Sequence, residues 1–218
     1  MPQDGFALFS RCHEPISQVF WKAFHVFSTQ GAAPLHKCIK LSYDTNLDAY
    51  FPTPGRFEYD DVNTMLQEAA TWQGVGFPFV YHIDDIEAHI TLLIWTDNQP
   101  KGSTVALRED AILFSHQREN AGAWRSFMDL LITLTEELDS TFCFVDRDVP
   151  LHTMNDREIL NFAEQVRSGR RIPIYLAIHE RLLSSTEALK VNPEFCQVTK
   201  RFGYTIVSDK EMGTPVEA

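Results

Sequence analysis

The strongest constraint on the fold is a pair of alternating apolar runs joined by only two residues. In FPFVYHI, at residues 77–83, apolar side chains recur at every second position, and IEAHITLLIW, at residues 86–95, repeats this pattern. A period of two is typical of β-strands, whose successive side chains point to opposite faces of a sheet. Because only Asp84 and Asp85 separate the runs, the sequence predicts a β-hairpin, although Asn-Gly or Asp-Gly would be a more typical turn. TVALREDAILF, at residues 104–114, then completes an antiparallel meander of about three strands.

Helical periods occur before and after this meander. The clearest lies in AGAWRSFMDLLITLTEELDS, at residues 121–140, where apolar side chains recur at steps of three and four. Further helices are predicted from capping residues and stop signals. They are expected at 17–30, ended by Gly31; from Asp60 as N-cap to Gly74; at 155–169; and from Pro193 to Gly203.

Short apolar runs between these helices predict additional strands. These runs lie at 38–43, 141–145, 172–178 and 204–207. IPIYLAI, at 172–178, is almost wholly apolar, as expected of a central strand covered on both faces. The segment 43–57 contains Pro52, Pro54 and Gly55 and is expected to be an irregular loop. The sequence therefore predicts one α+β domain over residues 1–218, with a mixed, largely antiparallel sheet, flanking helices and a flexible tail at 211–218.

The overall composition excludes several classes of function. The net charge of −11 argues against direct binding of nucleic acid or of an anionic membrane. No run of 18 apolar residues is present, so no membrane span is expected. The start of the chain carries Asp4 where a signal peptide would carry positive charge. The four cysteines, Cys12, Cys38, Cys143 and Cys196, form no CxxC pair, which favours reduced thiols. These features predict a cytoplasmic protein.

The negative charge is concentrated in residues 44–99. This segment holds ten acids and the single base Arg56, so it carries −9 of the total −11. The acids are Asp44, Asp48, Glu58, Asp60, Asp61, Glu68, Asp84, Asp85, Glu87 and Asp97. The helix dipole explains Asp60 and Asp61 at a helix start without any partner. The other acids are suited to a negative field that steers and docks a basic protein, although such clusters also arise by chance in acidic proteins.

Motifs for enzymatic chemistry are sparse. The sequence contains no GxxxxGKS or GxxxxGKT, GxGxxG, GxSxG, HExxH or DxDxDG motif. Strand pairing across the predicted turn places His82 opposite Glu87, with His89 further along the same face. Two histidines and a carboxylate, with an acid such as Asp146 added, could bind iron or zinc in a hydrolase or oxygenase. The preferred interpretation is a solvated hairpin face without metal, because a bound metal needs a further contact to orient its ligands.

Two stretches give the chain a family resemblance: FVYHIDDIEAHITLLIW, at residues 79–95, and the helix AWRSFMDLLITLTEEL, at residues 123–138. With its acidic α+β layout and no catalytic signature, the chain resembles the immunity proteins of bacterial polymorphic and type VI secretion toxin systems. The resemblance implies a stoichiometric inhibitor that neutralises a cognate toxin, often a nuclease. Carboxylates of such an inhibitor cover the toxin's active site in place of nucleic-acid phosphates.

The sequence therefore predicts a protein–protein interaction through an acidic surface, without a cofactor. The expected contacts are Asp60, Asp61, Asp84, Asp85, Glu87 and Asp97. The expected partner is a basic protein toxin, and neither nucleic acid nor a membrane is a direct ligand. Two alternatives stay open: the metal-dependent enzyme that uses His82, Glu87 and His89, and a non-catalytic interaction or scaffold subunit.

Overall fold

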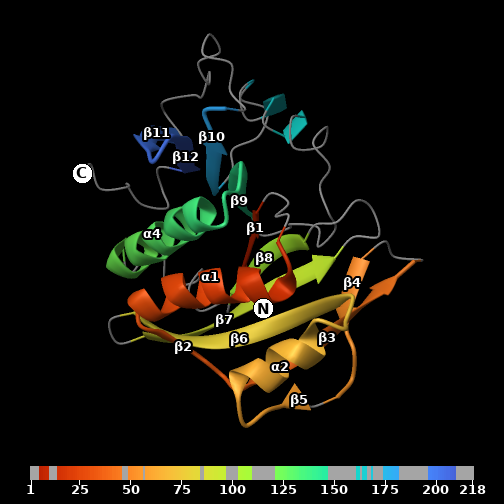
Figure 1. Ribbon diagram of the computed structural model, residues 1–218. Helices are drawn as coiled ribbons and strands as arrows, with labels where there is room; N and C mark the ends of the chain where they lie inside the picture. The colour runs from red at the N-terminus through yellow and green to blue at the C-terminus, as the bar shows by residue number, and fades with distance from the viewer. Residues whose placement is uncertain are drawn as a thin grey trace.

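A large β-sheet with helices on one face forms the framework of the molecule (Figure 1). The computed structural model describes residues 5–9, 14–45, 49–55, 57–83, 86–96, 103–109, 121–146, 161–162, 164–165, 168, 174–181 and 196–209. The predicted α+β class is confirmed, and each pairing between described strands is antiparallel. No helix in this part of the chain is long and apolar enough to cross a membrane. The predicted tail at 211–218 lies outside the described residues.

The strands follow the order β11-β12-β10-β9-β1-β8-β7-β6-β3-β4 across the sheet, with β2 paired to β6 and β5 paired to β3. Their bounds are β1 Gly5–Phe9, β2 Ala32–Pro34, β3 Lys37–Asp44, β4 Ala49–Pro52, β5 Phe57–Glu58, β6 Gly74–Ile83, β7 Ile86–Thr96, β8 Ser103–Glu109, β9 Phe142–Asp146, β10 Tyr175–His179, β11 Cys196–Arg201 and β12 Tyr204–Asp209.

The predicted hairpin is the long pair β6–β7. It is paired from Ile83 and Ile86 beside the turn to Gly74 and Trp95 at the far end, and β8 pairs with the other edge of β7 as the predicted meander requires. Alternation buries one side of the pair against the helices. The buried side chains are Val75, Phe77, Phe79, Tyr81, Ala88, Ile90, Leu92 and Ile94.

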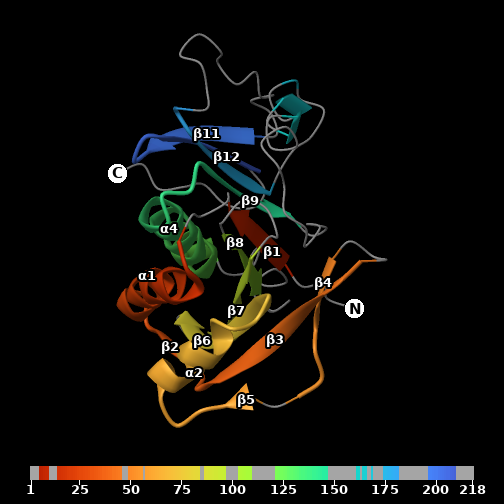
Figure 2. The same ribbon diagram turned by 45° about the vertical axis from the view of Figure 1, so that its right-hand side comes forward.

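Strand β1, which periodicity does not identify in the sequence, lies in the middle of the sheet (Figure 2). Its central residue Ala7 pairs with Leu107 of β8 on one side and with Val145 of β9 on the other. The strands of residues 32–109 and those of residues 142–209 are therefore hydrogen-bonded into one sheet through β1, within the part of the chain described.

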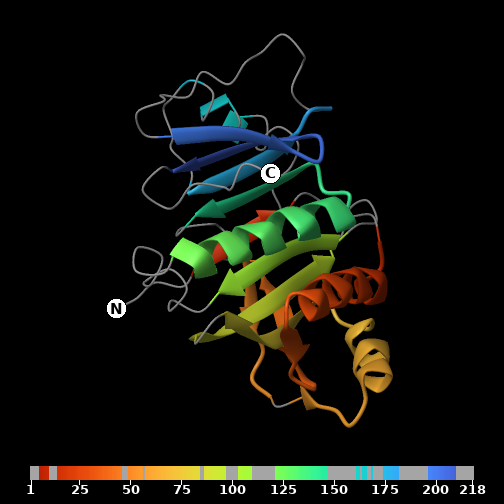
Figure 3. The same ribbon diagram turned by 90° about the vertical axis from the view of Figure 1, so that its left-hand side faces the viewer.

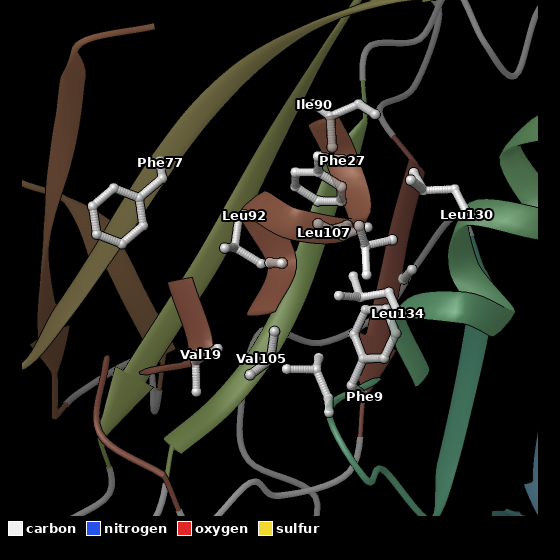
Figure 4. Close-up of a cluster of buried hydrophobic side chains, with 14 of the residues drawn as sticks. Phe9, Val19, Phe27, Phe77, Ile90, Leu92, Val105, Leu107, Leu130 and Leu134 are labelled. Carbon is white, nitrogen blue, oxygen red and sulfur yellow. The ribbon is translucent and has the colours of Figure 1, made fainter. Parts of the chain in front are cut away.

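Two helices cover one face of the sheet and lie side by side (Figures 1 and 3). Helix α1 spans Ile16–Thr29 and α4 spans Ala121–Glu137, so the helices predicted at 17–30 and 121–140 are confirmed. Gly31 follows α1 with φ of 83°, which is the left-handed conformation that ends many helices. Apolar side chains of both helices meet those of the sheet in a closely packed core (Figure 4). They include Phe9, Val19, Phe27, Leu92, Leu107, Leu130 and Leu134.

The opposite face of the sheet carries a smaller core around Trp95, whose side chain is fully buried. It gathers Leu41, Leu93, Phe142, Phe144, Phe162, Leu176, Ile178 and Val207. Strand β10 contributes to both cores, as its almost wholly apolar sequence predicts. Of the helix predicted at 155–169, only 161–162 and 164–165 are described as helical.

Two local predictions are wrong in the first half of the chain. The segment 43–57 is not an irregular loop throughout, because β4 pairs with β3 and β5 also pairs with β3. Pro52 is tolerated because β4 lies at the edge of the sheet, where a missing N–H need not break a ladder. Helix α2, Val62–Ala69, begins after Asp61 rather than Asp60, and Gly74 begins β6 instead of ending the helix.

The helix predicted from Pro193 to Gly203 is also wrong. The described residues of this segment form β11, which pairs with β12, the final strand that the sequence does predict. Phe202 and Gly203 have φ of 51° and 78°, and two successive positive φ values are typical of a two-residue hairpin turn. Pairing with β12 overrides the local helical signal, because β-propensity depends strongly on cross-strand neighbours.

The central position of β1 predicts a specific sensitivity to proline. Ala7→Pro removes a backbone donor from a strand that is paired on both sides and leaves a buried acceptor without its partner, so we expect a loss of about 2 kcal/mol or more in the free energy of unfolding. Ala7→Gly keeps the N–H and should cost only about 1 kcal/mol. Urea denaturation followed by far-UV circular dichroism measures both. Equal losses in the two variants would contradict the placement of β1.

Candidate interaction surface

The turn end of the β6–β7 hairpin presents a polar face on the side of the sheet away from α1 and α4. Glu87 and His89 occupy alternate positions on β7, and their side chains are 61% and 53% exposed. His82 is directly opposite Glu87 and is also exposed. The predicted sharing of one face by these three residues is confirmed, and Glu87 Oε1 lies 3.9 Å from Nε2 of His89.

The hairpin face does not gather further ligands from the rest of the described chain. Asp146 ends β9, and β1 and β8 lie between β9 and β7. Three interstrand spacings amount to roughly 14 Å, which is far beyond the reach of a shared metal ion. Among the described residues, no group of three His, Cys, Asp or Glu side chains is placed to hold a metal.

Of the acids at the start of α2, Asp61 has a structural role. Its Oδ1 accepts hydrogen bonds from the backbone N–H of Asn63 at 2.8 Å and of Thr64 at 3.0 Å, and its Oδ2 accepts one from the Thr64 hydroxyl. The hydrogen bonds from Thr64 are the main reason that the pKa of Asp61 is lowered. Asp61 is therefore the N-cap of α2, whereas Asp60 is exposed beside it.

Among the described acids of the segment 44–99, Glu58 and Glu87 lie on separate strands, β5 and β7. Glu58 of β5 is directly opposite Lys37 of β3, a base that lies outside this segment in the sequence. Glu87 and Thr96 lie near opposite ends of β7, and nine residues of extended strand span roughly 30 Å. Asp97 follows Thr96 directly in sequence. The predicted contacts Asp84, Asp85 and Asp97 lie outside the described residues.

Bases of the C-terminal half form ion pairs within that half. Arg181 pairs with Asp139 at 3.0 Å, Lys200 pairs with Glu180 at 2.7 Å, and Arg201 pairs with Asp129. In these pairs the bases do not neutralise the acids of residues 44–99. The charge asymmetry of the sequence is therefore not cancelled by these three pairs.

Exposed aromatic side chains lie at the edge of the sheet, at the end of the strand predicted at 38–43 and in the segment predicted as a loop. Tyr43 of β3 is 38% exposed and Phe51 of β4 is 44% exposed. The Tyr43 ring lies 5.2 Å from that of Tyr50, which in turn lies 5.6 Å from the ring of Trp95. The run AYFP carries the β-favouring residues Tyr50 and Phe51, and this is the signal that could have revealed the edge strand.

No protein-family model, curated protein or solved structure matches this chain.

The cap at Asp61 predicts a pH-dependent contribution to stability. At pH 7, Asp61→Ala should lower the free energy of unfolding, and the matched variant Asp60→Ala should change it less, because only Asp61 is seen to cap α2. The folded-state pKa of Asp61 lies below its usual value, so its contribution is complete above the unfolded pKa of about 3.9. It is lost as pH falls through the lower folded pKa. Urea denaturation from pH 7 to pH 3 measures the difference, and equal effects of both variants at pH 7 would contradict the cap.

Proposed function

We propose that this chain is an immunity protein that binds and neutralises a basic protein toxin through the turn end of the β6–β7 hairpin. The observation that supports this proposal is the exposed carboxylate of Glu87 at the end of a strand pair that is buried along its helix-facing side. Asp84 and Asp85 precede it in the sequence by three and two residues, respectively. Three acids thus occur within four residues of sequence at one end of the hairpin.

A carboxylate on a strand that is paired on both sides is suited to docking. β7 is hydrogen-bonded to β6 and β8, and its apolar side chains are fixed in the core by α1 and α4. A group on such a framework loses little conformational freedom when a partner binds, so less binding free energy is spent on ordering it. Carboxylates also accelerate the encounter with a positively charged surface, an effect that weakens with salt.

The chemistry of the acids favours a nuclease as the toxin. Nucleases bind phosphate groups with Arg and Lys side chains, and carboxylates can occupy the same positions. Nucleic acid itself would be repelled by a chain of net charge −11. A toxin that attacks nucleic acid inside the cell would require its inhibitor in the cytoplasm, which is where we place this protein.

Charge reversal at the hairpin end tests the proposal. The probe is the protein encoded beside this gene, because the resemblance implies that toxin and immunity genes are neighbours. The double variant Asp85→Lys/Glu87→Lys should raise the dissociation constant by roughly ten- to a hundredfold and slow association. Surface plasmon resonance at two salt concentrations measures both effects.

Glu136→Lys/Glu137→Lys is the matched control, because it makes the same change in net charge at two exposed positions of α4. This variant should bind like the wild type, and circular dichroism verifies that both variants are folded. Equal affinities of the two variants would remove the hairpin as the docking surface. A wild-type chain that neither binds the neighbouring protein nor protects cells from it would remove the proposed function itself.

A further inference from the structure

One row of paired residues crosses eight strands on the helix-covered face of the sheet, and its character changes along the way. From β6 to β9 the row is apolar and fully buried or nearly so. From β10 to β11 it is polar. The residues, in order, are Phe77, Leu92, Leu107, Ala7, Val145, Tyr175, Ser208 and Gln197. The last three belong to β10, β12 and β11.

All three polar residues carry a buried atom without a hydrogen-bond partner among the described residues. These atoms are the hydroxyl of Tyr175, Oγ of Ser208 and Oε1 of Gln197. Tyr175 is only 2% exposed and Ser208 only 4%. Among the described residues, no other buried side-chain nitrogen or oxygen lacks a hydrogen-bond partner. The three atoms therefore lie on neighbouring strands and in one row of paired residues.

The three polar residues differ in length, and the shortest of them, Ser208, lies between the other two. Directly paired residues of adjacent strands have Cβ atoms about 5 Å apart. Ser208 is flanked on one side by Tyr175 and on the other by Gln197, both of which extend further from the sheet. The same face packs against α4, because Tyr175 shares a core with Leu130 and Leu134, and Arg201 of β11 pairs with Asp129 of α4.

The charge of the surroundings restricts what could bind there. Burial raises the pKa of Tyr175 well above its ordinary value, with Cys143, Arg201 and Asp129 as nearby charges or dipoles, so its hydroxyl stays protonated and can donate at neutral pH. Arg201 is already paired with Asp129. The three unpartnered atoms carry no net charge and include both donors and acceptors. They fit a neutral ligand that both donates and accepts hydrogen bonds.

Leaving three buried polar atoms unpartnered would be costly, because each loses its hydrogen bonds to water without replacement. Atoms shut off from bulk solvent can recover these bonds only from something small and enclosed. Water meets these requirements, since a buried water typically makes about three hydrogen bonds to otherwise unpartnered groups.

We propose that internal water binds between α4 and the C-terminal strands, bridging Tyr175, Ser208 and Gln197. In this arrangement the Tyr175 hydroxyl donates to the water, Gln197 Oε1 accepts from it, and Ser208 Oγ completes the site. The bridge connects β10, β12 and β11 through side chains in addition to their backbone ladder. It makes the C-terminal part of the helix–sheet interface hydrated, whereas the N-terminal part is lined by apolar side chains.

The sign of a single substitution tests this site. Tyr175→Phe removes a hydroxyl that is either bonded to water or bonded to nothing. If water is bound, the variant loses a hydrogen bond and its melting temperature should fall by about 2–4 °C. If the hydroxyl is unpartnered, the variant removes only a desolvation cost and its melting temperature should rise. Differential scanning calorimetry at pH 7 measures the shift, and an unchanged or higher melting temperature overturns the proposal.

Tyr204→Phe calibrates this measurement. Tyr204 is also buried, but its hydroxyl donates to the backbone oxygen of Ser140 at 2.7 Å, so its removal should lower the melting temperature whether or not water is bound elsewhere. A second measurement is a crystal structure of the wild-type chain at about 1.5 Å resolution. We expect an ordered water within about 3.2 Å of at least two of the three atoms. Clear density for the three side chains without such a water overturns the proposal.

Discussion

The architecture depends on the backbone hydrogen bonding of β1 on both of its sides. This strand lies between β8 and β9, strands that are separated from it by roughly a hundred residues or more of sequence. Because β1 leads into α1 and α4 leads into β9, its insertion also brings both helices onto the same face (Figure 2). The main core forms beneath them, so the packing of α1 against α4 and the continuity of the sheet have one common cause.

The elements that sequence reasoning predicts carry either a long periodic pattern or a distinct apolar run, as β9, β10 and β12 do. The β6–β7 pair and α4 each carry enough residues for a period to be recognised, and Gly31 marks the end of α1. Strands β1, β4 and β11 contain five, four and six residues, which is too short to distinguish a strand from a loop or a helix by period alone. They are strands because of partners distant in sequence, and single-sequence patterns contain no information about such partners.

The charges of the candidate site show the same limit of reasoning from a single sequence. Counting along the sequence groups ten acids together, but several of those that the structure describes have separate positions or roles. Asp61 is used to cap α2, Glu58 faces Lys37, and the two ends of β7 lie roughly 30 Å apart. The hairpin end was predictable because a turn and its flanking residues remain neighbours in any fold that contains the hairpin. The extent of an acidic surface was not predictable, because it depends on strand order.

The two halves of the sheet therefore differ in ways that bear on function. Around β6, β7 and β8 the core is apolar, and it fixes Glu87 on a strand paired at both edges. On strands β10, β12 and β11 the same row carries polar in place of apolar side chains, namely Tyr175, Ser208 and Gln197. Polar groups there weaken the hydrophobic contribution to packing, so local opening should begin in the C-terminal strands rather than at the hairpin.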